Sequence, residues 1–555
     1  MTLPPTTRLT HPPHLRATLD RLAPDRPPTA WDAKIERLLN GLRQPHLYVG
    51  RSLLDGSPWL LDRALLRTHA HVMGGTGSGK TSLCLAPLAF QLTAHADSSV
   101  VYIDMKGDNA LFWGAFIEAE RAGLPFRWFT LQPGAASFAF NPFTQAANQA
   151  RGVTARAQSL LTALGLYYGD AYGKSFFQSV TLDTLTAFLG KFRDVRSFAD
   201  LARYAEQPGS YAATNTDQEN SQHLRMLLRQ LASVAPLNLT ADARPALRPE
   251  VVRDAIDMAD VLTRKQVVYF SLPSLEEELT AKSVGKLALY ALVHAAKVVS
   301  RTRPCVPVYV FVDEFQQVCA ENVKILLEMA RSMGVYLVLS HQDISQLKTV
   351  DYDITSTVES CTTFKMTLEA SSLAALKQME EYSGETREHT LSWAQAVHPM
   401  LDPNDDHAFA LGRAYPRHDF EPPTATIGEV VRPTRSRNEI LAVSAHPLRG
   451  FVRSRSDSGM TQYAGQWATV ECEFPTTAEE YKLRSETPWP SEHPSCVTVA
   501  GGPGDDDGDA DPSLPNHPLP VPPPPKATDR AIADRLRDAL RGQPAAPPAG
   551  RAAGG

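Results

Sequence analysis

The eight residues Gly74–Thr81 constrain the fold of this chain more than any other part of the sequence. They read GGTGSGKT and match the pattern G-x-x-x-x-G-K-[ST] at every defined position. A β-rich run at residues 69–73 precedes them, and a stretch with helical periodicity at residues 81–94 follows. Because this strand, loop and helix order is the context that the pattern requires, we read the segment as a phosphate-binding loop rather than as a glycine-rich turn without a ligand.

The residue types of the loop predict how it binds phosphate. Glycines permit positive φ and close approach of the backbone, so the N–H groups from Gly77 to Thr81 are expected to converge on phosphate oxygens. Lys80 is expected to reach the β- and γ-phosphates, and the Thr81 hydroxyl to ligate Mg²⁺. Pro87 is expected to kink the helix that follows. The predicted cofactors are ATP and Mg²⁺, and the nucleotide is held by Gly74, Gly75, Thr76, Gly77, Ser78, Gly79, Lys80 and Thr81.

The rest of the chain predicts an α/β domain interrupted by helices. β-rich runs alternate with helical stretches up to about residue 149, which indicates a mostly parallel sheet covered by helices. Helical periodicity replaces the strand signal in the next hundred residues, and the alternation then resumes. The predicted divisions are an N-terminal arm (1–48), the nucleotide-binding domain (49–149 and 264–430) around an all-α insertion (150–263), a small mixed region (431–484) and a disordered tail (485–555) rich in Pro and Asp.

A second candidate segment is the apolar run of residues 308–312, which ends in Asp313 and Glu314. An unbroken apolar run is typical of a central parallel strand, and two carboxylates at its buried end need a cation or specific partners. We predict that Asp313 binds Mg²⁺ through a water molecule and that Glu314 polarises the attacking water. The alternative is an exposed strand end with two solvated acids.

Gln342 and Arg331 complete the predicted catalytic set with Glu314 and Lys80. Gln342 follows the β-rich residues 335–340, at a point where its amide would sense the γ-phosphate. Arg331 lies near the end of the preceding helical stretch. From its position alone, Arg331 reads as a solvated arginine at a helix end rather than as a residue that reaches a neighbouring subunit.

The composition narrows the class of protein. With 555 residues the chain is long enough for two to four folding units. A net charge of -6 argues against a protein that coats nucleic acid through global basicity, but it does not exclude a local basic channel. Six scattered cysteines without a C-x-x-C pair suit a reducing cytoplasm. No stretch reaches the roughly 18 apolar residues of a spanning helix, so any membrane association is expected to come through a partner.

In chain order, these segments resemble the TraD/TraG type IV coupling proteins, and more broadly the HerA/FtsK superfamily. The resemblance rests on GGTGSGKT, YIDMKGD, FNPF, the helical insertion, VVYFSLPS, FVDEF and MARSMGVYLVLSHQDISQLK. It implies a RecA-like, ATP-driven motor with an inserted all-α domain, assembled as a hexamer around a DNA channel. It also implies a sensor role for Gln342 and a trans-acting arginine finger at Arg331. Asp104, Lys106 and Asp108 match an acidic-Lys-Gly strand end of the family, although a packing or turn role fits them equally well.

The chain departs from many coupling proteins in lacking two N-terminal transmembrane helices. The leading hypothesis is an ATP-hydrolysing DNA translocase that delivers DNA or relaxase-bound DNA to a transfer apparatus, with a relaxase and a type IV secretion channel as partners. The alternatives are a soluble HerA/FtsK-like translocase in repair, plasmid maintenance or defence, and a nucleotide-gated cargo adaptor.

No DNA-contacting residues are assigned. An aromatic and cationic cluster suits base stacking, although helix packing is the better reading; its members are Tyr167, Tyr168, Tyr172, Lys174, Phe176 and Phe177.

Overall fold

The structure is a computed structural model, and most of the chain up to residue 499 can be described. The described residues are 9, 11–23, 30–42, 45–149, 151–164, 174–192, 194–207, 222–240, 248–275, 277–319, 323–349, 352–370, 372–383, 385–394, 424–433, 435–454 and 467–499. The proposed base-stacking cluster lies outside this set, because Tyr167, Tyr168 and Tyr172 are not described and no side chain is described for Lys174, Phe176 and Phe177.

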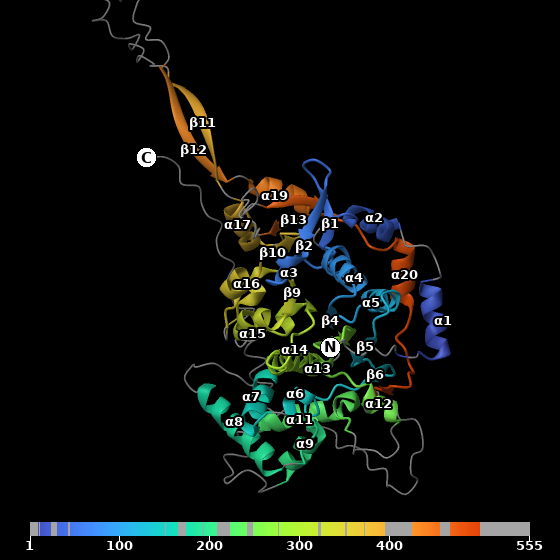
Figure 1. The fold of residues 1–555 in the computed structure, drawn as a ribbon. Helices are drawn as coiled ribbons and strands as arrows, with labels where there is room; N and C mark the ends of the chain where they lie inside the picture. Colours follow the sequence, from blue (N-terminus) through green and yellow to red (C-terminus); the bar gives the residue numbers. More distant parts are fainter. Residues whose placement is uncertain are drawn as a thin grey trace, which may run out of the picture. The chain divides into compact units, whose positions relative to one another are not determined.

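An 11-stranded sheet forms the centre of the fold (Figure 1). The strands of the described residues are β1 (His46–Ser52), β2 (Pro58–Asp62), β3 (Ala70–Met73), β4 (Ser99–Asp104), β5 (Phe126–Thr130), β6 (Ala136–Phe138), β7 (Val267–Ser271), β8 (Val308–Asp313), β9 (Val335–His341), β10 (Phe364–Thr367), β11 (Glu385–Ala394), β12 (Thr424–Pro433), β13 (Arg449–Ser454), β14 (Ala468–Glu471) and β15 (Cys496–Thr498). The sheet order is β2-β1-β14-β13-β10-β3-β9-β8-β4-β7-β5.

The strands from β10 to β5 in this order are all parallel, and β13, β14, β1 and β2 continue the sheet in antiparallel fashion. In the register, Met73 lies opposite His341, and Asp104 lies opposite Asp313. The carboxyl ends of β3, β9, β8 and β4 therefore meet at one edge, where ligands bind in open α/β sheets. The predicted fold class, a mostly parallel α/β sheet, is confirmed.

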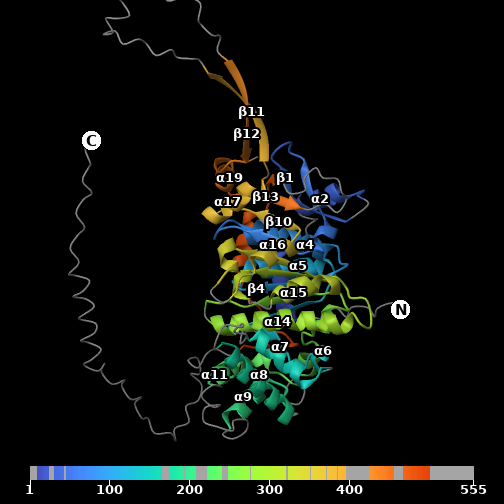
Figure 2. The same ribbon diagram turned by 90° about the vertical axis from the view of Figure 1, so that its left-hand side faces the viewer.

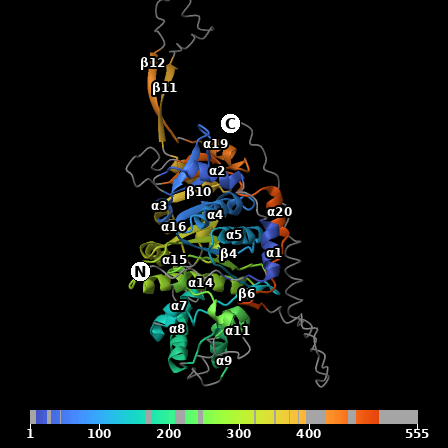
Figure 3. The same cartoon turned by 45° about the vertical axis from the view of Figure 1, so that its right-hand side comes forward.

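Helices cover both faces of the sheet. On one face lie α4 (Ala86–Ala94) and α5 (Asn109–Arg121), with α1 (Pro13–Leu22) and α20 (Ala478–Glu486) packed side by side outside α5 (Figure 3). On the other face lie α14 (Glu278–Val299), α15 (Val323–Ala330) and α16 (Thr355–Cys361). Four other α-helices of the described residues accompany the sheet: α2 (Ala30–Leu39), α3 (Arg63–Leu66), α17 (Leu373–Tyr382) and α19 (Arg437–Ser444).

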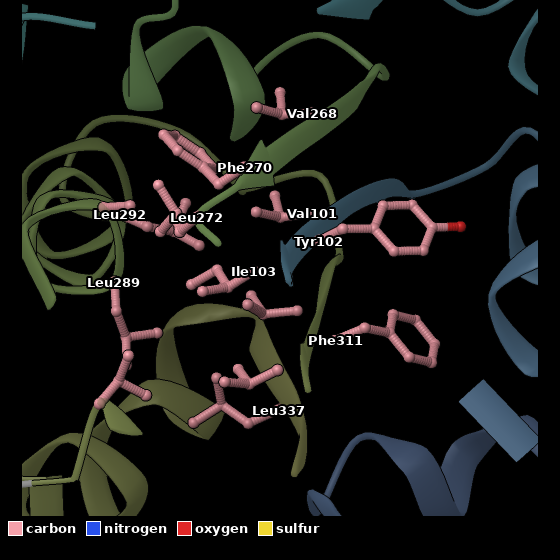
Figure 4. Packing of buried hydrophobic residues seen from close by; sticks show 14 of the residues in the cluster. Val101, Tyr102, Ile103, Val268, Phe270, Leu272, Leu289, Leu292, Phe311 and Leu337 are labelled. Atoms are coloured by element: carbon pink, nitrogen blue, oxygen red, sulfur yellow. The ribbon is translucent and has the colours of Figure 1, made fainter. Parts of the chain in front are cut away.

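Side chains of the central strands alternate between the two helical layers (Figure 4). Ile103 and Leu272 point toward Leu289 and Leu292 of α14, whereas Tyr102 points to the opposite side. Strand β8 is buried along its whole length, and so is β4. Burial on both faces explains why these strands read as unbroken apolar runs rather than as an alternating pattern.

In the segment predicted as an all-α insertion, the secondary-structure elements of the described residues are helices joined by loops and turns. Its helices gather beyond α14, on the side away from the sheet (Figure 2). They are α7 (Val153–Ala163), α8 (Lys174–Lys191), α9 (Phe198–Glu206) and α11 (Gln222–Ser233). The short helix α6 (Ala146–Gln149) precedes them in the chain, and the short helices α12 (Pro249–Arg253) and α13 (Met258–Val261) connect them to β7.

The structure divides the C-terminal part of the chain differently from the predicted boundaries. Residues 431–484 do not form a separate region, because β13 and β14 are part of the main sheet, between β10 and β1. The ordered chain also continues past residue 485: β15 pairs with β6, and the Trp489 ring packs on Phe112 with centroids 3.7 Å apart. One buried tryptophan and one short strand suffice to order a stretch whose proline and serine content resembles a tail.

The N-terminal segment also differs from a detached arm. Helix α1 packs on α5 and α20, and strand β1 starts at His46, inside the predicted arm. The hairpin of β11 and β12 was not predicted; its strands pair with each other in a separate two-stranded sheet (Figure 1). Among the described residues, no helix combines the length and apolar character needed to cross a bilayer.

Candidate active site

The loop between β3 and α4 has the backbone that its glycines predict. Gly77 and Gly79 have φ values of 83° and 82°, in the left-handed region that favours glycine. A Cβ atom on Gly79 would lie 2.7 Å from Leu83 Cδ1, so this position has neither the conformation nor the space for another residue. Burial lowers the pKa of Lys80, whose ammonium donates to the carbonyl oxygens of Gly74 and Gly75 at 2.6 and 3.0 Å.

The helix after the loop is not the single α-helix expected from residue 81 to residue 94. A π-helical turn spans Lys80–Leu85, and α4 begins at Ala86 with Pro87 in its first turn. Pro87 has no N–H to donate, and the start of an α-helix is where that donor is not needed. The expected kink therefore takes the form of a change of helix type just before the proline.

Asp313, the last residue of β8, joins the phosphate loop to the acidic strand end. The Thr81 hydroxyl donates to Asp313 Oδ2 at 2.8 Å, and the Ser340 hydroxyl of β9 donates to Asp313 Oδ1 at 3.0 Å. The backbone N–H of Glu314 also donates to Oδ1, at 3.0 Å. Donors from separate parts of the chain therefore fix the Asp313 carboxylate, which is buried. The alternative of a solvated acid pair is wrong.

Glu314 has an unusual backbone for a residue with a side chain. Its φ of 54° and ψ of 52° lie in the left-handed region, which costs a non-glycine residue about 1–2 kcal/mol. The side chain is buried and accepts from Gln342 Nε2 at 3.2 Å. Burial raises the pKa of this carboxyl, but the Lys106 ammonium and the Gln316 amide outweigh burial and hold the pKa below its usual value. Glu314 is therefore ionised at neutral pH.

Lys106 is the residue that reasoning from the sequence undervalued. Its ammonium lies 2.8 Å from Glu314 Oε1 and 3.2 Å from Asp313 Oδ2, so one cation bridges both acids. Burial lowers the pKa of Lys106, but the two carboxylates outweigh it, so the net shift is upward. The sequence contained a pointer to Lys106, the acidic-Lys-Gly strand end, but this motif alone does not tell a residue of the site from a residue of a turn.

Asp104 and Asp108 hold the turn that presents Lys106. The buried Asp104 carboxylate accepts the N–H groups of Lys106, Gly107 and Asp108 at 2.9, 3.1 and 2.7 Å. Burial and the nearby Asp313 raise the pKa of Asp104 to about 6. Asp108 caps the first turn of α5 by accepting from Ala110 and Leu111. Of the two roles considered for these aspartates, the contacts favour stabilisation of the turn.

Gln342 and Arg331 lie at opposite ends of β9. Gln342 follows the strand at the site edge, and its amide donates to Glu314; the predicted contact with the γ-phosphate stays a prediction. Arg331 precedes the strand and is exposed. Seven residues of β9 put roughly 20 Å between the two ends at about 3.3 Å per residue. Arg331 does not join the site of its own chain, so a contact with nucleotide requires a second subunit.

The assembled residues fit a Mg²⁺-bound nucleotide. A hydroxyl and a carboxylate oxygen, Thr81 Oγ1 and Asp313 Oδ2, face one another, and oxygen is the ligand that Mg²⁺ prefers. In the loop, the buried Oγ atom of Ser78 has no hydrogen-bond partner among the described residues. Among the described residues, the partners of the Lys80 ammonium are two backbone carbonyls, which a phosphate oxygen would replace.

The sequence was compared with protein families and with curated proteins. Residues 307–401 match the family described as the TraM recognition site of TraD and TraG. No curated protein matches the sequence.

Solved structures of a coupling protein share the fold. An unbound form of the bacterial conjugative coupling protein TrwBΔN70 has a TM-score of 0.52 and 14% identity, over 81% of this chain and 93% of that one. The plasmid coupling protein TrwB in complex with ADPNP, a non-hydrolysable ATP analogue, and TrwB in complex with ADP and Mg²⁺ each have a TM-score of 0.51 and 14% identity, over 84% of this chain and 95% of theirs. The family match over residues 307–401 agrees with the predicted resemblance to the TraD/TraG coupling proteins, and the solved structures show that the chain shares the fold of TrwB.

Proposed function

We propose that this chain is an ATP-hydrolysing motor of the type IV coupling protein kind, which moves DNA toward a transfer apparatus. The observation that carries the proposal is the hydrogen bond from Thr81 to Asp313, because it joins the phosphate loop to the acidic end of β8 in one site. The matched family and the nucleotide complexes of TrwB support the same reading.

Each residue of the site has a proposed task. The backbone of Gly74–Thr81 cradles the phosphates, and Lys80 leaves its carbonyl partners for the β- and γ-phosphate oxygens. Thr81 and Asp313 would hold Mg²⁺, which neutralises charge on the phosphate oxygens when bound. Glu314 accepts a proton from the attacking water, and Gln342 orients Glu314 and that water.

The test is ATP hydrolysis by the purified chain with and without single- and double-stranded DNA. We expect DNA to stimulate hydrolysis, and Lys80→Ala to abolish it. Lys282→Ala is a matched control, because Lys282 forms an exposed pair with Glu278 and is remote in sequence from the site. Hydrolysis that survives Lys80→Ala would refute the site, and hydrolysis without any response to DNA would refute the motor.

Arg331 is proposed to act on the nucleotide of a neighbouring subunit in a hexamer. Its exposure at the far end of β9 supports a role between subunits rather than within one. Lys80→Ala and Arg331→Ala should each be inactive alone, and mixing them should restore part of the hydrolysis, since some interfaces then pair an intact loop with an intact arginine. No recovery on mixing, or sedimentation as monomers with ADPNP and DNA, contradicts this assignment.

A relaxase is the proposed protein partner. The match of residues 307–401 to a family named for recognition of TraM supports a protein-recognition role for this part of the chain. A pull-down with a relaxase, repeated with ATP analogue and with ADP, tests it. Binding of DNA without any relaxase in either nucleotide state would favour a translocase outside conjugation.

A further inference from the structure

Lys106 places its ammonium where a divalent cation is expected. The oxygen that it contacts at 3.2 Å, Asp313 Oδ2, is the same oxygen that accepts the Thr81 hydroxyl at 2.8 Å. A hydroxyl and a carboxylate in this arrangement are the protein ligands that a Mg²⁺ ion needs beside a phosphate chain. Lysine and metal therefore compete for one carboxylate oxygen.

The contacts of Lys106 allow its ammonium to move away from Asp313 and Glu314. Its backbone is fixed, because Asp104 accepts the N–H groups of residues 106–108. Its side chain is 43% exposed, whereas the Asp313 and Glu314 side chains are 3% and 6% exposed. A four-carbon stem on a fixed backbone moves its charged tip into solvent at little cost. The acids remain in place and need a replacement cation.

Lys80 does not provide that replacement in the described structure. Its ammonium is bonded to the carbonyl oxygens of Gly74 and Gly75, on the loop side of the site. Lys106 is thus the cation that contacts the acid pair. A bare Mg²⁺ would have to displace it without gaining any other anion, whereas Mg²⁺ that arrives with phosphates brings compensating negative charge.

We propose that Lys106 is an exchangeable cation that holds the Asp313–Glu314 pair until a divalent metal arrives together with a nucleotide. The lysine makes the site bind metal weakly when nucleotide is absent, and so couples the entry of metal to that of nucleotide. Lys106 is a positioning residue in this scheme, and the inference rests on the proposed nucleotide-binding function.

The experiment measures binding of Mn²⁺, a spectroscopic substitute for Mg²⁺, by electron paramagnetic resonance on the full chain without nucleotide. We expect Lys106→Gln to bind Mn²⁺ at least about tenfold more tightly than the native chain, because the competing cation is gone. Lys106→Met, which keeps the aliphatic stem, should do the same. Lys106→Arg keeps the charge and should bind as weakly as the native chain, as should the surface control Lys282→Gln.

Two further arms locate the effect and separate it from the proposed function. Adding Asp313→Asn to Lys106→Gln should remove the gained binding if the metal sits at this carboxylate. With ADP present, the native chain should gain more affinity for Mn²⁺ than Lys106→Gln does. Equal Mn²⁺ affinities of the native chain and Lys106→Gln without nucleotide, or equal behaviour of the Arg and Gln variants, overturn the exchange. Failure of ADP to bind any variant refutes the nucleotide site, and the arms without nucleotide still decide the role of Lys106.

Discussion

Glu314→Gln is the change that tests the proposed chemistry most directly. Glutamine has the shape of glutamate and keeps the side chain at a position whose backbone is already left-handed, with φ of 54°. Lys106 retains its contact with Asp313 at 3.2 Å. The variant therefore removes a proton acceptor and one negative charge while the rest of the site stays in place.

The expected sizes follow from these contacts. A positioned general base contributes roughly 10²–10⁴-fold to a reaction, which corresponds to about 3–5 kcal/mol of activation free energy. The lost contact with Lys106 is worth less than about 1 kcal/mol of folding stability, because the lysine is 43% exposed and solvent screens the pair. Affinity for ATP should hold or rise, since one negative charge beside the phosphates is gone.

The assay is single-turnover hydrolysis of ATP, with the dissociation constant of a fluorescent ATP analogue and the unfolding free energy measured on the same variant. Glu278→Gln is the matched control, because it makes the same change in a surface pair with Lys282. A Glu314→Gln chain that hydrolyses ATP within threefold of the native rate would show that Glu314 is not the base. Loss of nucleotide binding in parallel with hydrolysis would show that it holds the ligand instead.

Three further outcomes are expected. Ser340→Ala removes a donor to the buried Asp313 carboxylate and should lower the unfolding free energy by about 2 kcal/mol in urea titrations, with weaker Mg²⁺-dependent binding of ADP. Burial lowers the pKa of His341 to about 4, so protonation of this histidine in the unfolded chain lowers the unfolding free energy as the pH falls below 6.5. At pH 5 the part due to His341 is about 2 kcal/mol. It is measured as the difference between the native chain and His341→Gln above pH 6.5 and at pH 5, because burial lowers the pKa of His69, His294 and His493 in the same direction. Trp489→Ala should cost about 3–4 kcal/mol in the same titrations, because the ring is buried against Phe112; no loss would return residues 485–499 to a tail.

The central sheet was predictable because its strands are buried on both faces. Residues 308–312 were expected as a strand, and β8 spans Val308–Asp313. Residues 335–340 were expected likewise, and β9 spans Val335–His341. A strand buried on both faces must be apolar along its length, so it can be recognised from the sequence without knowledge of its partner strands. Carboxylates at its end stand out because buried charges need partners.

The antiparallel pairing at the other edge of the sheet was not predicted, because those strands are not unbroken apolar runs buried on both faces. Strand β14 is short and only partly buried, and it enters the sheet through pairing with β13 and with β1, which lies about 400 residues earlier in the sequence. Pairing of this kind depends on register rather than on local composition. Strand β15 has three residues, which is below the length at which alternation can be recognised.

The site likewise contains residues that the sequence predicts and residues that it does not. Lys80, Thr81, Asp313 and Glu314 are set by motif and strand ends, and the structure brings them together. Ser340 and Lys106 act through contacts between neighbouring strands, which a single sequence does not reveal. Ser340 would have been found by asking which hydroxyl on the adjacent parallel strand lies beside Asp313.

The arrangement separates what stays from what moves when nucleotide binds. Asp313, Glu314 and Ser340 lie at or next to the ends of buried strands, where neighbouring strands fix the backbone, and Thr81 lies in the helical turn after the phosphate loop. The two ammonium groups lie on long side chains, and their present partners are groups that phosphate or metal would replace. Binding therefore requires an exchange of partners by Lys80 and Lys106 rather than a rearrangement of the sheet. It follows that substitutions at the strand ends should change stability and binding together, whereas substitutions at Lys106 should change metal binding with little effect on the fold.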